Sequence, residues 1–208
     1  DSLRENKVMS LKTRFGNLGN ILDFDNLTEE NIYVLDSPIL TNSQFKKFKK
    51  FFSTKVKVID CTFDIKSSLK DRIEKIREES ETAIREGSTN LILSDKNISN
   101  QKSSIPSILT VGAVHSHLVK HGLRGYCSLN VECSDALDTH SFAVLIGVGA
   151  TTVNPYLAID SIYQRFEKKL FGKSDFESCV TKFKKSVDAG LLKIMSKMGI
   201  SVISSYRG

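Results

Sequence analysis

Short apolar runs alternate along the chain with longer segments in which apolar residues recur at helical spacing. The runs lie at 56–60, 90–94 and 126–132, and a longer segment follows each of them. Residues 91–93 are continuously apolar, as expected of a strand in a sheet that is covered on both faces. Strands that alternate with helices predict an α/β fold with a mostly parallel sheet, flanking helices and right-handed crossovers.

Capping residues and glycines set the expected limits of the helices. A side-chain oxygen can accept from the free amides of a first turn, and a glycine often follows the last turn. On this basis we expect helices after Thr41 or Asn42, from Ser67 or Ser68 to Gly87, from Pro106 to Gly122, from Asp138 or Thr139 to Gly147 and Gly149, after Asn154-Pro155, and from Ser174 or Asp175 to Gly199.

Other segments carry weaker patterns. Leu3, Val8, Met9 and Leu11 fit one face of a short helix, and an apolar run precedes Pro38. We expect a polar loop at 95–104, a short strand around Val153 and a final strand at 200–204.

The helix after Thr41 carries phenylalanines on one face and lysines elsewhere. Phe45, Phe48 and Phe52 share a side, and four lysines occupy the other positions. One hypothesis is a basic amphipathic anchor for a membrane or RNA. The alternative is a helix that packs on the protein by its phenylalanines and leaves its lysines in solvent, and the helical periodicity favours it.

The composition is that of a globular chain with a sizeable core. Of the 208 residues 40% are hydrophobic and 26% are charged, and no run of about 18 apolar residues could span a membrane. The net charge is +6, but acidic residues are interleaved with basic ones, which argues against a nucleic-acid surface. We expect one domain over 1–208. Both ends look cut, so we expect an excised piece of a larger polypeptide.

Four scattered cysteines bear on compartment and cofactor. Cys61, Cys127, Cys133 and Cys179 form no Cys-x-x-Cys pair. Such thiols are typical of buried free cysteines in the cytoplasm or another reducing compartment such as a plastid. Cys127 and Cys133 alone would leave an iron–sulfur cluster short of ligands.

Three histidines fall within one expected helix and raise the question of a metal site. His117 and His121 are four residues apart and share a face, as two zinc ligands must, but His115 lies about 200° from His117 around the axis. No carboxylate stands between them as in a zinc-protease helix, and His140 could join them only through folding. We therefore predict no metal ligands and no tightly bound zinc or iron.

No other motif indicates chemistry. Gly147 and Gly149 form only part of a phosphate-binding loop, and no G-x-S-x-G nucleophile motif occurs. From the residues alone we predict no catalytic residue, no cofactor-binding residue and no metal ligand.

Several ordered blocks resemble the central domain of glutamate synthase. The long blocks are 105–115 with 122–124, 140–150, 154–158, and 190–201 with Ser205-Tyr206. Shorter blocks that fit the same family are Leu3-Arg4-Glu5, Met9-Ser10-Leu11, Gly19-Asn20, 35–40 and 94–96. The resemblance covers essentially the whole chain.

The resemblance implies a multidomain parent that converts glutamine and 2-oxoglutarate into two glutamates. An amidotransferase domain releases ammonia, which crosses an internal tunnel to an FMN site in a (β/α) barrel domain, and the parent also uses an iron–sulfur cluster. The central domain is implied to be a structural linker, related to an incomplete (β/α) barrel, that contributes to the ammonia path. Its partners would be the neighbouring amidotransferase and FMN-binding domains, without nucleic acid or membrane.

Some family features are missing or altered. The family's nucleophilic cysteine and its flavin and cluster motifs are absent, so we expect this fragment to hold no cofactor, to bind no flavin and to leave glutamine intact. His115-Ser116-His117 stands where the family has three consecutive histidines, and His140-Ser141 where it has a pair. These departures argue against shared chemistry by those side chains.

Two further expectations concern the place of the chain in its parent. The turn 147–157, with small Thr151 and Thr152, is expected either to face a neighbouring domain and line the ammonia path or to be an ordinary surface turn. The alternative function is a stand-alone α/β enzyme with a ligand site at the strand carboxyl ends. The electron donor of the parent, ferredoxin or a nicotinamide coenzyme, stays open.

Overall fold

The computed structural model describes residue 5 and residues 7–15 and 33–207. At its centre is a four-stranded parallel sheet in the order β3-β5-β7-β8, formed by Val56–Asp60, Asn90–Ser94, Ser128–Glu132 and Thr152–Asn154. Strands that succeed one another in the central sheet are also neighbours in space, and a helix joins each to the next. This order is that of an incomplete (β/α) barrel, so the predicted fold class is confirmed.

The helices begin and end close to the predicted capping residues. They are α2 Asn42–Phe52, α3 Leu69–Arg85, α4 Ser107–Lys120, α5 Thr139–Gly147, α6 Tyr156–Glu167 and α7 Phe176–Met198. Thr41, Ser68, Asp138 and Asp175 each accept a backbone hydrogen bond as N-caps, and Gly199 ends α7 in the left-handed conformation. Local sequence therefore defines these helix ends.

One face of the sheet, which we call the outer face, is apolar and lies under α3, α4 and α5. Leu91 and Leu93 of β5 and Leu129 and Val131 of β7 point to it, since alternate residues of a strand share a face. Each of the four is at most 1% exposed, and they form one core cluster with buried residues of the three helices. Burial of apolar surface is sufficient to hold this face.

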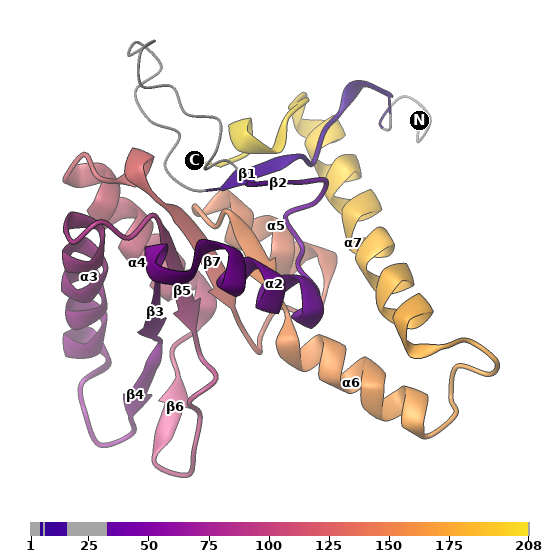
Figure 1. Cartoon of the computed structure of the whole chain (residues 1–208), viewed down its shortest axis with the longest axis horizontal. Helices are drawn as coiled ribbons and strands as arrows, with labels where there is room; N and C mark the ends of the chain where they lie inside the picture. The colour runs from indigo at the N-terminus through magenta and orange to yellow at the C-terminus, as the bar shows by residue number, and fades with distance from the viewer. Residues whose placement is uncertain (1–4, 6, 16–32, 208) are drawn as a thin grey trace.

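The opposite face, which we call the inner face, is polar along β7 and β8. Asn130 and Thr152 are fully buried there, and the Thr152 hydroxyl donates to Asn130 Oδ1 at 2.6 Å. Asn130 Nδ2 donates in turn to the Leu91 carbonyl at 3.2 Å. Helix α2 crosses in front of this face (Figure 1). Its buried phenylalanines pack with Phe15, Leu40 and Ile92 in a second core cluster.

These contacts confirm that α2 packs on the protein through its phenylalanines. Lys46, Lys47 and Lys50 are exposed as predicted. Lys49 differs, because its side chain is 37% exposed and its amino group binds a carboxylate of the sheet.

Two expected segments differ in the structure. The predicted loop 95–104 contains β6 (Lys102–Ser104), which pairs antiparallel with β4 (Thr62–Asp64). The predicted strand 200–204 is wrong: Val202 makes a single bridge to Ser10, and Ile203–Ser205 form a 3-10 turn. Both outcomes depend on partners far away in the sequence, which a local pattern cannot supply.

The remaining elements close the edges of the sheet. β1 (Thr13–Phe15) and β2 (Tyr33–Leu35) form an antiparallel pair, and the segment 38–40 runs along β8. Helices α6 and α7 form a hairpin (Figure 1), and α7 runs back to pack against α5, with Val187, Leu191 and Met195 in the main core cluster. None of the helices in the described part of the chain has both the length and the apolar character for crossing a bilayer. The predictions at Leu3 and Gly19-Asn20 lie outside the described residues.

Candidate functional site

A buried carboxylate with two cations lies where β5 and β7 end. The Glu132 side chain is 4% exposed and accepts a hydrogen bond from the Ser94 hydroxyl at 2.7 Å. Ser94 stands opposite Glu132 in the parallel register. The Glu132 carboxylate also pairs with Lys96 at 3.0 Å and with Lys49 of α2 at 3.3 Å. The cluster thus ties α2 to the end of the sheet.

The environment of Glu132 keeps it ionised. Burial alone would raise the pKa of its carboxyl group, because burial removes water from the charged form. Hydrogen bonds from Ser94 and Lys96 and the charge of Lys49 outweigh burial, and the pKa of Glu132 lies below its ordinary value. Glu132 is therefore an anion at neutral pH that is neutralised within the domain.

A second carboxylate joins the same end of the sheet to the next loop. Asp95 is 3% exposed, and its Oδ2 accepts from the backbone amide and the hydroxyl of Ser134 at 2.9 and 2.6 Å. Burial, and then the Asp95 charge, raise the pKa of the Tyr156 phenol above its usual range. Lys96 Nζ lies 5.0 Å from the centre of the Tyr156 ring. These contacts connect β5, the β7–α5 loop and α6.

This location is where a stand-alone α/β enzyme would bind its ligand. Polar groups do converge there. Glu132 and Asp95 Oδ2 have their partners inside the domain, whereas the buried Asp95 Oδ1 accepts no hydrogen bond from the described residues. Cavities of about 460 and 1060 Å³ are lined by other residues. A general base must present a free lone pair to its substrate. Both oxygens of Glu132 are already bonded within the domain, and this fits a role in positioning the loops.

Residues of the family-like blocks meet at the opposite, amino end of the sheet. Arg124 donates to the carbonyls of Cys127 and Gly149 at 2.6 and 2.8 Å and to His115 Nδ1 at 3.1 Å. Gly149 has a φ of 120°, and a Cβ there would lie 2.3 Å from His115 Nδ1. Glycine is thus required by the backbone conformation and by the histidine ring. His115 has a structural position here, on the side of α4 away from His117.

The amino end of the sheet, where Arg124 lies, also has a basic cavity. It has a volume of about 460 Å³, and Lys12, Arg14, Arg124 and Arg207 contribute to its lining. Burial lowers the pKa of Arg124, and burial and the Arg124 charge lower the pKa of Arg207 to about 10. The amino end of the sheet therefore carries a concentrated positive potential.

The turn 147–157 is mostly buried within the domain itself. Thr151 and Thr152 are 2% and 0% exposed. The Thr151 hydroxyl accepts from the Leu129 amide at 3.1 Å, and that of Thr152 donates to Asn130. A bulky residue at either position would disrupt the sheet, so these two side chains are structural parts of this domain.

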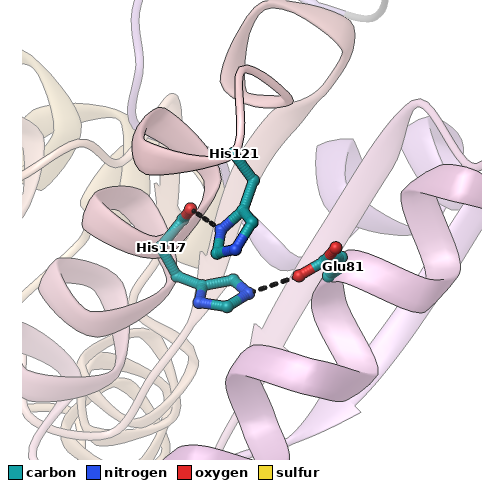
Figure 2. Close-up of side chains that lie close together, drawn as sticks. All are labelled: Glu81, His117 and His121. Atoms are coloured by element: carbon teal, nitrogen blue, oxygen red, sulfur yellow. Dashed lines mark hydrogen bonds and ion pairs between the residues drawn. The ribbon is translucent and has the colours of Figure 1, made fainter.

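The other helical histidines meet a carboxylate that sequence spacing could not reveal. His117 Nε2 lies 2.6 Å from Glu81 Oε2 of α3, and His121 Nδ1 lies 2.8 Å from the His117 carbonyl (Figure 2). His115 bonds to Arg124, whereas His117 bonds to Glu81, so the two histidines lie on different sides of α4. This agrees with the predicted angle of about 200° between them around the helix axis. His140 is exposed near the start of α5. The only signal in the sequence was the i,i+4 pair itself.

The cysteines are free and buried, as predicted. Cys127 and Cys133 flank β7 at opposite ends, roughly 20 Å apart by the rise of six strand residues. Burial raises the pKa of the Cys61 thiol to about 12 and that of Cys127 to about 11, so both are protonated at neutral pH.

Fold and site together define an α/β scaffold of incomplete-barrel type in which the buried Glu132 carboxylate pairs with two lysines. The chain belongs to the glutamate synthase central domain family, whose model matches residues 1–208. It is 52% identical to the glutamate synthase [NADPH] large chain of Azospirillum brasilense and 39% identical to that of Bacillus subtilis. It is 38% identical to the chloroplastic ferredoxin-dependent glutamate synthase of Spinacia oleracea.

These alignments cover 100% of this chain but only 14% of each relative. Solved structures support the fold. A mandelate oxidase variant with an FMN adduct matches with a TM-score of 0.50 and 13% identity, over 63% of this chain and 37% of that chain. A flavocytochrome b2 variant with benzoylformate has a TM-score of 0.50 and 12% identity, over 79% of this chain and 36% of that chain. At such identity the likeness concerns the fold alone.

Proposed function

We propose that residues 1–208 form one domain that joins the amidotransferase and FMN-binding domains of a glutamate synthase and helps to enclose the ammonia path between them. Family membership over the whole chain is the observation that carries the proposal. The chain spans 14% of its relatives' length, so most of the reaction must be performed by other parts of the polypeptide. The domain itself acts without catalytic residues and without a flavin or cluster of its own.

Exposed apolar residues at the carboxyl end of the sheet support contact with neighbouring domains. We call six of them the carboxyl-end rim: Ile65, Ile98, Ile108, Leu109, Leu137 and Leu157. Each lies in a loop or a first helical turn that follows a strand, and each is at least 43% exposed. Large apolar side chains at one end of a domain are typical of surfaces that another protein surface covers.

An apolar surface also suits an ammonia path. Ammonia that is protonated or lost to water cannot attack the carbonyl-derived intermediate, and an apolar wall offers neither protons nor a route to solvent. We therefore assign to the rim the contribution to the ammonia path that the sequence suggested for the turn with Thr151 and Thr152. The partners are segments of the same polypeptide, without nucleic acid or membrane. Relatives include chloroplastic enzymes, and four free thiols suit the cytoplasm or a plastid.

The test introduces a charge into the rim of the full-length enzyme. Leu137→Arg and Leu157→Arg change side chains that are 59% and 44% exposed, so the domain should fold normally. We expect synthesis from glutamine to fall roughly tenfold or more, because positioning across an interface is disturbed, while synthesis from added ammonia persists. The matched control is Val119→Arg, 55% exposed at the last turn of α4 and away from the rim.

The two activities decide the outcome. A fall in glutamine-dependent synthesis alone, with the control unchanged, supports the proposal. Equal loss of both activities in the rim variants, or no loss of either, would remove the rim from the ammonia path. Stoichiometric FMN on the purified 208-residue chain would contradict the cofactor-free role.

A further inference from the structure

Three potential metal ligands converge from two helices on the outer side of the sheet. Glu81 lies on α3, His117 lies on the last turn of α4, and His121 is the residue that caps the carboxyl end of α4. Their ligand atoms all lie within 4.8 Å of one another. Figure 2 shows the two imidazole rings side by side, with the Glu81 carboxylate directed at the His117 ring. The ring centroids are 4.2 Å apart.

The hydrogen bond of His121 prepares this side chain to bind a cation. A carbonyl oxygen can only accept, so the contact between His121 Nδ1 and the His117 carbonyl places a proton on Nδ1. In the neutral ring the lone pair is then on Nε2. Metal-binding histidines commonly donate their other ring N–H to a backbone carbonyl in this way, which fixes the tautomer and the ring orientation.

The carboxylate is also held in place by a partner. Arg85 binds Glu81 Oε1 through Nε at 2.8 Å, which leaves Oε2 to face His117. Both carboxylate oxygens of Glu81 thus have fixed neighbours, Arg85 at Oε1 and His117 at Oε2. Glu81 can thus supply one anionic oxygen.

We propose that Glu81, His117 and His121 form a site for a zinc-class divalent cation that links α3 to α4. Two imidazole nitrogens and one carboxylate oxygen are ligands that Zn²⁺ accepts, and water can occupy the fourth position. The Glu81 and His117 side chains are 21% and 19% exposed, and His121 is exposed, so the ion can enter from solvent.

The metal would replace the proton shared by His117 and Glu81. Tetrahedral ligands at about 2.0 Å from zinc are roughly 3.3 Å apart, whereas Nε2 and Oε2 are now 2.6 Å apart. Binding therefore requires the proton of His117 Nε2 to move to Nδ1 of the same ring or to solvent. It also requires the two side chains to separate by roughly 0.7 Å, the difference between these distances. Partly exposed side chains can make this movement without a change of the helices.

This proposal replaces the sequence-based prediction that the chain binds no metal. That prediction rested on the position of His115 around the helix axis and on the absence of a carboxylate between the histidines. The fold brings Glu81 from the preceding helix, 36 residues before His117 in the sequence.

The experiment measures zinc binding by the tag-free 208-residue chain and, in parallel, by the full-length polypeptide. After removal of metal by a chelator, the protein is dialysed against micromolar Zn²⁺ and its zinc content is measured. The variants are Glu81→Gln and His121→Ala, and His140→Ala is the control because His140 is an exposed histidine outside the cluster. Circular dichroism establishes that each variant is folded.

We expect one zinc ion per native chain, with binding at least about tenfold weaker in Glu81→Gln and His121→Ala and unchanged in His140→Ala. Cobalt bound to the native chain should show the strong visible absorption of a tetrahedral site, and Glu81→Gln should lack it. The proposal is overturned if the native chain takes up no stoichiometric zinc. It is equally overturned if both cluster variants bind as the native chain does.

Discussion

The two faces of the central sheet are closed by different means. The outer face presents leucine and valine to three helices, and non-directional burial is enough to hold them. The inner face has one aromatic helix over it, and beneath it Asn130, Thr152 and Glu132 bond to their neighbours on adjacent strands. In a closed barrel the inner face would be filled by layers of side chains from all strands.

The difference shows how a partial barrel can be stable. Helix α2 supplies the apolar material that the missing strands would provide, and directional bonds fix the strands beneath it. Asn130, Thr152 and Glu132, the polar side chains beneath α2, bond within the domain. The following substitutions test each side of this comparison.

The largest effect is expected at the aromatic helix. Phe48 is fully buried and contacts the rings of Phe15, Phe45 and Phe52 at centroid distances of 5.2, 5.8 and 5.2 Å. Phe48→Ala should lower the free energy of unfolding by about 3–5 kcal/mol through lost burial and a cavity. Phe51→Ala, at a residue 56% exposed, should cost about 1 kcal/mol or less. Urea unfolding measures both free energies. Similar losses in the two variants would contradict the conclusion that the buried face of α2 stabilises the inner face of the sheet.

A smaller effect is expected in the polar ladder. Asn130→Ala leaves the buried Thr152 hydroxyl without its acceptor and removes the side-chain bond to the Leu91 carbonyl, which should cost about 1–3 kcal/mol. Thr152→Val removes the other half of the 2.6 Å hydrogen bond. Because the pair shares one interaction, the double variant should lose less than the sum of the single losses. Strict additivity would show that this bond contributes nothing to the inner face.

The regular elements could be predicted because their signals are local. The strands 56–60 and 90–94 and the caps Thr41 and Asp138 follow from short patterns of apolar spacing and side-chain oxygens. The polar inner face was not predicted, because the continuous apolar run at 91–93 suggested apolar cover on both sides. The polarity of this face depends on which strands are neighbours, because Asn130 of β7 stands opposite Thr152 of β8.

The partners of the charged side chains could not be predicted from the sequence. The lysines of α2 were expected in solvent, yet Lys49 reaches Glu132, which is 83 residues further along the chain. Glu81 pairs with Arg85 one turn further along α3, and its second oxygen meets His117 of α4. In both cases the partner comes from another element, and one sequence without structure does not define such pairs.

The smallest effect is expected in the acid range. Since the folded-state pKa of Glu132 is below the ordinary value of 4.5, its ionisation stabilises the fold above that pH. This contribution should be lost as pH falls below 4.5 and through the lower folded-state pKa. In Glu132→Gln the free energy of unfolding should therefore fall less between neutral and acid pH than in the native chain. The difference should be about 1 kcal/mol or less, because both lysines reach solvent. Unfolding curves between neutral and acid pH measure it, and parallel profiles would contradict a stabilising ion cluster.

We propose that the buried Glu132 carboxylate at the carboxyl end of the sheet holds the scaffold together and takes no part in the reaction. The most direct test is the turnover of full-length glutamate synthase with Glu132→Gln, measured per folded molecule with glutamine and with added ammonia. Both rates should stay within about twofold of the native enzyme, because no acid–base step passes through this group. A loss of roughly 100-fold or more in both rates, at unchanged stability, would make Glu132 a catalytic residue and contradict the scaffold.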